Sequence, residues 1–195
     1  MIASARQLFN QQFTEEKYRD FLADLDREFD LKIPFRVAET PVFVGKEFKE
    51  KLMTTSNEII DFIVQPDFKQ RMEGAVPIHL RVPNDDGHSL FIALDFAVCT
   101  EGNGDLVPRL IEIQGFPSLF GYQDLLGNKF HQHYTLPRNL EFHFGLTSAE
   151  YWSRLQKAIL REHDPENVIL LEIEPYKQNT TIDFLVTKHH LGIEP

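Results

Sequence analysis

Residues 89–114 read SLFIALDFAVCTEGNGDLVPRLIEIQ. Two runs with strand-like alternation flank Asn103 and Gly104. Asn-Gly between alternating runs is the strongest short signal for a β-hairpin, because a two-residue type I′ turn needs positive φ at both central positions. The pattern therefore predicts a hairpin over residues 90–115, closed by a type I′ turn.

The register of this hairpin decides which side chains lie together. A two-residue Asn-Gly turn pairs residues whose numbers sum to 207, which places Asp95 opposite Glu112 and Ala97 opposite Leu110. Side chains two positions apart share a face, so Gln114 should join the two acids. The other face is then entirely apolar and consists of Ile92, Leu94, Phe96, Val98, Ile111 and Ile113.

Two acids opposite one another in a sheet require compensation. Directly opposed Cβ atoms are ~4.5 to 5.5 Å apart, where like charges are destabilising. A divalent cation would offset this repulsion, since Mg²⁺ binds carboxylate and amide oxygens and keeps positions open for water or phosphates. Three alternatives stay open: a solvated or arginine-paired face, the acid pair of a retaining glycosidase, and a bulge near Pro108 that would send Asp95 and Glu112 to opposite faces.

The composition is that of a globular protein. The 195 residues, 42% of them hydrophobic, suffice for one sizeable domain or two small ones. A net charge of −10 without any Lys/Arg cluster argues against nucleic acid and anionic membrane as partners. No apolar run approaches the ~18 residues of a membrane span. The single cysteine, Cys99, favours a reducing cytoplasm, and the oligomeric state is left open.

Helical patterns dominate residues 1–74. Thr14 is a good N-cap followed by two acids, and apolar residues then recur at helical spacing to about Phe29. A second amphipathic pattern covers residues 46–64. We expect residues 1–74 to form a helical segment that packs on a core.

Residues 75–195 are expected to form that core, of class α/β or mixed α+β, around a mostly antiparallel central sheet. A helix is predicted over residues 122–134, and Thr147 with Glu150 forms a capping box that opens another. Residues 167–175, NVILLEIEP, indicate a buried strand. A last helix follows from Thr180, with Gly192 placed for a left-handed C-terminal cap.

The stretch LIEIQGFPSLFGYQ, residues 110–123, resembles the circularly permuted ATP-grasp family, the relatives of glutathionylspermidine synthetase. The shared features are an acid in one strand, a glycine-containing hairpin, a strand ending Glu-x-(Asn or Gln), and a Pro-Ser-x-x-x-Tyr continuation. By this resemblance Asp95, Glu112 and Gln114 would be metal ligands that bridge Mg²⁺ to the phosphates of ATP. The last strand and helix would form a Rossmann-like unit on the acceptor-substrate side.

The resemblance implies the N-terminal part of an ATP-dependent carboxylate-amine ligase, with ATP and a small amine, amino acid or peptide as partners. Two positions depart from the family pattern: Gln114 stands where Asn is usual, and Ala93 where Arg is frequent. The lysines of the family's nucleotide clamp lie in a further domain, so we expect no ATP turnover by residues 1–195 alone. A non-catalytic interaction module is the alternative, in which FPSLFGY and the apolar side of the last helix form a partner surface.

Overall fold

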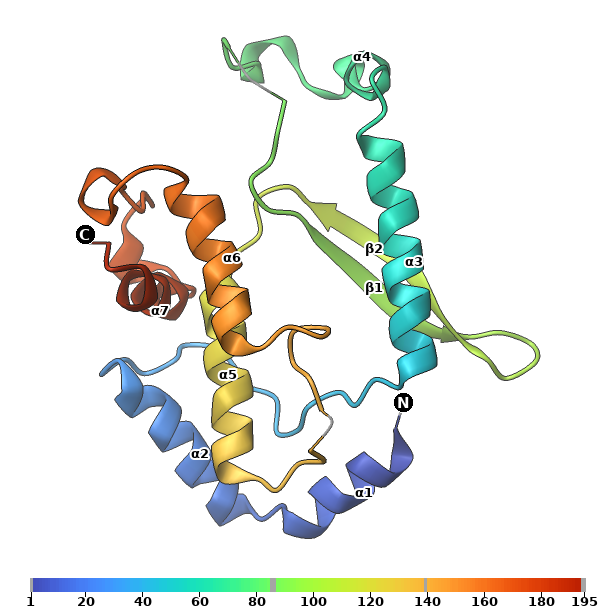
Figure 1. Cartoon of the computed structure of the whole chain (residues 1–195), viewed down its shortest axis with the longest axis vertical. Coiled ribbons are helices and arrows are strands. Elements are labelled where there is room, and N and C mark those ends of the chain that lie inside the picture. Colours follow the sequence, from blue (N-terminus) through green and yellow to red (C-terminus); the bar gives the residue numbers. More distant parts are fainter. Residues whose placement is uncertain (1, 85–86, 139, 194–195) are drawn as a thin grey trace. The chain divides into compact units, whose positions relative to one another are not determined.

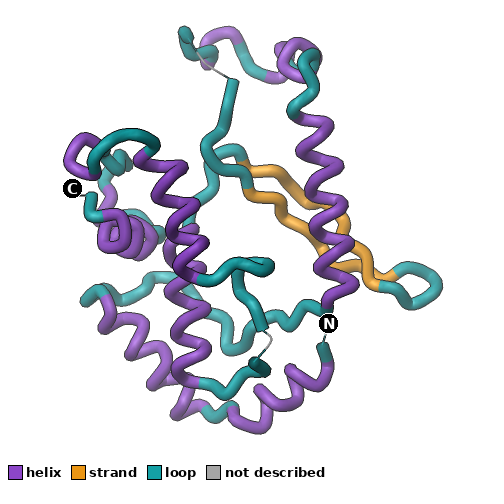
Figure 2. Tube along the Cα trace, viewed as in Figure 1, coloured by secondary structure: helices purple, strands orange, loops and turns teal. Residues whose placement is uncertain are grey.

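A computed structural model describes residues 2–84, 87–138 and 140–193. Contacts divide the chain into a helical unit, residues 1–43 with 118–195, and a hairpin unit, residues 44–117. The division therefore differs from the expected boundary after residue 74, because the first 43 residues pack with the end of the chain. The class is mixed α/β, as predicted: in the described ranges helices predominate and strands occur in the hairpin alone (Figure 2).

The helical unit contains α1 (Ala3–Gln12), α2 (Glu15–Glu28), α5 (Phe120–His133), α6 (Ser148–Leu160) and α7 (Thr181–Leu191) (Figure 1). The hairpin unit contains α3 (Lys46–Ile63), α4 (Phe68–Arg71), β1 (Ala93–Thr100) and β2 (Leu106–Gln114). Short 3-10 turns cover Glu73–Ala75, Ile78–Leu80, Pro165–Asn167 and Pro175–Lys177. Among the described residues, no helix is both long and apolar enough to cross a membrane.

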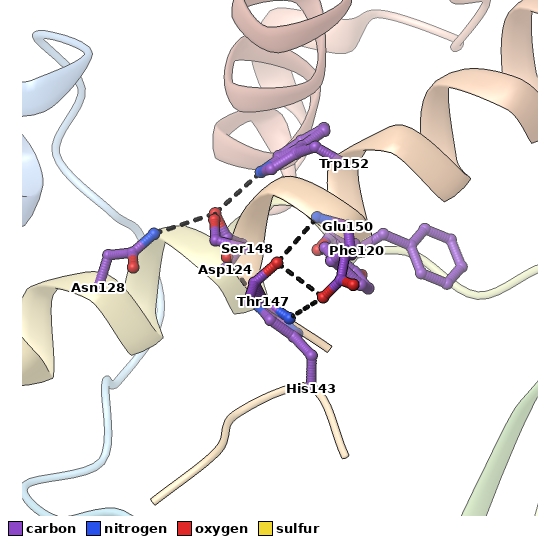
Figure 3. Close-up of polar contacts among 9 residues, drawn as sticks. Phe120, Asp124, Asn128, His143, Thr147, Ser148, Glu150 and Trp152 are labelled. Carbon is purple, nitrogen blue, oxygen red and sulfur yellow. Dashed lines mark hydrogen bonds and ion pairs between the residues drawn. The ribbon is translucent and has the colours of Figure 1, made fainter. Parts of the chain in front are cut away.

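Local capping explains why the predicted helices begin where they do. The Thr14 side chain accepts a hydrogen bond from the backbone of Lys17, and Thr147 and Glu150 form the complete capping box (Figure 3). Gly192 ends α7 in the left-handed conformation, with φ at 66°. Helix α1 was not predicted, since its N-terminus has no side-chain cap and its order depends on burial of residues such as Phe9.

The core of the helical unit surrounds α5, which packs against α2 and α7. Aromatic rings fill much of it: the Phe21 and Phe130 ring centroids are 4.7 Å apart, and those of Phe9 and Tyr134 are 4.5 Å apart. The largest fully buried side chains among the described residues are those of Phe9, Phe21, Leu25, Ile182, Val186 and Ile193. Helix α5 is buried around most of its circumference, which accounts for its weak amphipathic pattern.

The hairpin unit consists of the antiparallel β1–β2 pair with α3 packed against β2. The Lys51 ammonium donates to the Leu106 carbonyl at 3.1 Å. The expected larger sheet is absent from the described residues, because residues 75–84 and 87–92 form turns and loops and no strand. Pro77 and Pro83 remove backbone donors from this stretch, which disfavours pairing in a ladder.

The hairpin turn differs from the predicted type I′ turn. The Gly104 N–H donates to the Glu101 carbonyl at 2.8 Å, and the Glu101 N–H donates to the Asp105 carbonyl at 2.9 Å, which closes a three-residue loop. Only Gly104 has positive φ there, at 89°. Asn103 stays at negative φ because its side-chain oxygen accepts from the Asp105 N–H at 3.1 Å, a local bond that competes with the type I′ geometry.

The predicted buried strand near the C-terminus is wrong. Residues 168–173 are not assigned to any strand, and alternate side chains point into solvent. The composition of this segment favours a strand, but none of the described residues provides a neighbour to pair with it. Only the helical half of the expected strand-helix unit, α7, is therefore formed as predicted.

Alanine in place of Gly127 is expected to destabilise the helical unit, although alanine normally stabilises a helix interior by ~1 kcal/mol relative to glycine. A Cβ atom at residue 127 would lie 2.8 Å from Cγ of Phe142. We expect the free energy of unfolding in urea to fall by about 1 to 3 kcal/mol. In a Phe142→Ala background the same change should be neutral or stabilising. A stabilised Gly127→Ala single variant would contradict this packing.

Candidate functional site

The three residues predicted to form a metal site lie on one face of the hairpin. Asp95 in β1 is paired with Glu112 in β2, and Ala93 with Gln114. The Gln114 amide nitrogen donates to Asp95 Oδ2 at 2.9 Å and to Glu112 Oε1 at 2.8 Å. The predicted pairing of the two acids, and their convergence with Gln114, are therefore confirmed.

The two acids are paired because of two irregularities in the hairpin that the sequence pattern did not predict. The three-residue loop shifts the register by one, so that Ala97 faces Arg109 instead of the predicted Leu110. A β-bulge between Asp95 and Phe96 then shifts it back. The two irregularities cancel at Asp95 and Glu112, and the extra residue of the bulge is Ile111.

The two hydrogen bonds that the Gln114 amide donates already offset part of the electrostatic repulsion between Asp95 and Glu112. One amide group bridges both carboxylates, and Asp95 and Gln114 are half-buried while Glu112 is exposed. Among the described residues, no three or more His, Cys, Asp or Glu side chains are arranged to hold a metal. A cation at the hairpin would therefore have two carboxylates and, after rotation of the Gln114 amide, one amide oxygen as protein ligands.

This donor set fits Mg²⁺ better than the softer transition metals. Its atoms are all hard oxygens, and Mg²⁺ commonly takes only one or two protein carboxylates while phosphate and water complete its shell. The convergence of two carboxylate oxygens on one amide nitrogen is the observation that supports the fit. Glu112 is exposed and Asp95 and Gln114 are half-buried, so the site is open to solvent at Glu112.

A second polar cluster, which the sequence did not reveal, is centred on Asp124 of α5 (Figure 3). Asp124 is only 2% exposed, although its side chain is a carboxylate. Oδ1 lies 2.7 Å from Nε2 of His143. Oδ2 accepts from three further donors: Asn128 Nδ2 at 3.0 Å, Ser148 Oγ at 2.8 Å and Trp152 Nε1 at 2.8 Å.

The Asp124 cluster joins α5, α6 and the loop before α6. Burial alone would raise the pKa of Asp124, but hydrogen bonds from Ser148, His143 and Trp152 hold that pKa below its usual range. Both carboxylate oxygens are occupied, so this acid serves as an acceptor within the protein. The only local sequence signal for it is Asn128, one helical turn after Asp124.

The Pro-Ser-x-x-x-Tyr stretch on which the family resemblance depends, residues 117–122, leads into the first turn of α5. Its backbone donors are taken by Asp183 of α7, which accepts from the Leu119 N–H at 2.7 Å and from the Tyr122 N–H at 2.9 Å. Leu119 is held at a φ of 72°, a conformation that a leucine seldom adopts. The Tyr122 ring is buried, and burial raises its pKa to about 12. In this chain the stretch therefore has a structural role at the α5–α7 contact.

No protein-family model, curated protein or solved structure matches this chain. The resemblance to the ATP-grasp family therefore stays a prediction, carried by the motif residues quoted from the sequence. The function is inferred from the geometry of the chain's own side chains.

The helical unit also has an open cavity of about 440 Å³ beside the Asp124 cluster. Its walls come from the end of α2, the middle of α5 and the end of α7. The His190 ring stacks on Trp152 at a centroid distance of 3.9 Å, and burial together with repulsion from His189 lowers the pKa of His190. The lining residues are Glu28, Phe29, Asp124, Leu125, Asn128, Lys129, His131, Gln132, Val186, His189 and His190.

Ion pairs around the buried Lys129 fix α2 against α5 at one side of this cavity. The Lys129 ammonium lies 3.0 Å from Asp24 Oδ2 and 2.8 Å from Glu28 Oε2. His133 Nε2 contacts the same Asp24 oxygen at 3.0 Å. Hydrogen bonds from His133 and Lys129 lower the pKa of Asp24. Lys129 is thereby committed to two acids, which argues for a structural part in the packing of α5.

Proposed function

We propose that the hairpin binds a divalent cation together with the phosphates of ATP, as the metal-binding part of an ATP-grasp-like carboxylate-amine ligase. The observation that carries this proposal is the convergence of Asp95, Glu112 and Gln114 on one face of the β1–β2 pair. The family resemblance of the surrounding sequence supplies the reaction class.

The chain's residues would act by binding and orientation. Asp95 and Glu112 would hold the cation, and Gln114 would turn its amide so that the oxygen, in place of the nitrogen, faces the site. When bound, the cation would neutralise phosphate charge during formation of an acyl phosphate, which an amine then attacks. Acceptor binding would fall to a Rossmann-like unit that includes α7. The acceptor class is an amine, amino acid or peptide.

Titration with Mn²⁺ or Mg²⁺, with and without ATP, tests the proposal. We expect a dissociation constant of about 1 mM or tighter for the wild type, and loss of binding in Asp95→Asn and in Glu112→Gln. Glu101→Gln is the matched control, because it removes an equal charge from the same hairpin outside the site. Paramagnetic broadening of Gln114 side-chain amide signals by Mn²⁺ gives a second, local readout.

Two outcomes would contradict the metal site. One is equal cation binding by the wild type and both site variants, which would place the ion elsewhere. The other is absence of any divalent-dependent signal at 10-fold above the expected constant. Hydrolysis of ATP is not expected from these residues alone, so the assay measures binding and not turnover.

A non-catalytic interaction module is the second candidate, and the exposed apolar side chains favour it. Phe116 is 97% exposed, and Val98, Leu110, Ile111 and Ile113 of the hairpin are exposed as well. The last helix does not contribute as expected, because Ile182 and Val186 on its apolar side are buried in the helical unit. In this case Asp95→Asn and Glu112→Gln would leave the response to Mg²⁺ and ATP in a thermal-shift assay unchanged from wild type.

A further inference from the structure

Residues 168–173, VILLEI, form an irregular segment without a strand partner among the described residues. Val168 has φ at −118° and ψ at 133°, typical of a β-strand, and five of the six residues are Val, Ile or Leu. None of the described residues hydrogen-bonds to the backbone of residues 169–172. The segment thus has a strand-like sequence, begins in the strand conformation at Val168 and ends in a bend at Ile173, and it lacks the ladder that normally stabilises a strand.

The exposure of this segment alternates with period two. Ile169, Leu171 and Ile173 are 78%, 87% and 80% exposed, whereas Val168 and Leu170 are half-buried against the helical unit. A row of three large aliphatic side chains in solvent is unusual for a short loop. It is the arrangement of an edge strand whose inner face is anchored.

The backbone groups that remain free indicate the geometry of pairing. The Ile173 N–H donates to Glu172 Oε1 at 2.7 Å, and its carbonyl accepts from Gln178 Nε2 at 2.9 Å, so residue 173 is already satisfied. The backbone groups of residues 170 and 172 have no hydrogen-bond partner among the described residues. In an antiparallel ladder alternate residues bond to the partner, so Leu170 and Glu172 are the residues available to bond, and Leu171 would occupy a non-hydrogen-bonded position between them.

We infer that this segment pairs with the same segment of a second copy of the chain, antiparallel and with the two-fold axis at Leu171. The row of aliphatic residues is symmetric about that position: Ile169 would face Ile173, and Leu171 would face its own equivalent. Leu170 and Glu172 would exchange backbone hydrogen bonds. A two-fold contact places the same surface on both subunits, which this symmetry allows.

The charges on the segment are compatible with this register. Glu172 would lie opposite Leu170, and Glu174 opposite Val168, so no acid would face another acid. A pairing with its two-fold axis at Glu172 would place that acid directly opposite its own equivalent. Charge therefore favours the Leu171-centred register over one centred on Glu172. The inference is independent of the metal site, since it involves only residues of the helical unit.

Sedimentation of the full chain over a concentration series tests the pairing. We expect a reversible dimer, and Leu171→Lys should raise its dissociation constant about 100-fold or more, because two lysines would face one another at the axis. Phe116→Lys is the matched control, since it places the same charge at another highly exposed apolar residue. That control should leave the dimer unchanged.

Cross-linking checks the register in a Cys99→Ser background, which removes the single native thiol. Leu171→Cys should form an intermolecular disulfide under mild oxidation, while Glu172→Cys should not, because its equivalents would be separated by more than ~7 Å. A monomer at every concentration would overturn the inference. So would a dimer that Phe116→Lys disrupts and Leu171→Lys does not, or equal cross-linking of both cysteine variants.

Discussion

Alanine at position 124 is expected to lower the free energy of unfolding of the helical unit by about 3 to 5 kcal/mol, the range for removal of one partner from a buried charged network. Asp124 is the common acceptor for four side chains, so its loss leaves buried donors on His143 and Trp152 without partners. Urea denaturation followed by circular dichroism measures the change. Asp20→Ala, on the exposed side of α2, is the control and should stay within about 0.5 kcal/mol of wild type.

The conservative variant Asp124→Asn adds a pH test. The folded-state pKa of Asp124 lies below its ordinary value, so its carboxylate contributes stability above the unfolded pKa of ~3.9 and loses that contribution as the pH falls through the folded value. The stability difference between wild type and Asp124→Asn should therefore be full at neutral pH and shrink below about pH 4. A difference that grows on acidification would show that Asp124 is not held as a carboxylate.

Alanine at position 183 should destabilise the helical unit by about 2 to 4 kcal/mol, because the buried N–H groups of Leu119 and Tyr122 would lose their acceptor. The effect should be local as well as global. Hydrogen exchange should show loss of protection at these two amides, while the start of α6, capped by Thr147, keeps its protection. Unchanged exchange at Leu119 and Tyr122 would contradict the capping role of Asp183.

The pH dependence of Asp183 should be opposite to that of Asp124. Burial raises the pKa of Asp183, with the backbone hydrogen bonds acting in the other direction. Its contribution to stability is thus fully present below the unfolded pKa of ~3.9 and declines as the pH rises through the higher folded value. Wild type should therefore lose its advantage over Asp183→Asn as the pH increases from 3 to 7, and a growing advantage would contradict the raised pKa.

Features that depend on a few neighbouring residues were predicted well. The Thr14 cap, the capping box at Thr147 and the left-handed Gly192 all involve groups within about one helical turn. The hairpin itself was also predicted from its alternating runs. Its turn type was not, because the Asn103 side chain bonds the backbone two residues on and replaces the type I′ geometry.

The pairing of Asp95 with Glu112 was predicted correctly, but the turn and register from which it was predicted differ from those of the structure. Asp95 and Glu112 are paired as the Asn-Gly register required, but through a longer loop and a compensating bulge. A bulge near Pro108 was considered as a way to separate the acids. The bulge that forms lies at Ile111, between the turn and the acids, and so it restores their pairing.

The sequence alone determined the mixed α/β class, the positions of most helices and the existence of the hairpin, because hydrophobic periodicity and caps act over short separations. Tertiary structure alone decided the burial of Asp124, whose partner Trp152 is 28 residues away, and the capping of α5 by Asp183, 64 residues from Leu119. It also decided that residues 168–173 are not a strand of this chain's sheet, since a strand requires a partner and no local pattern supplies one.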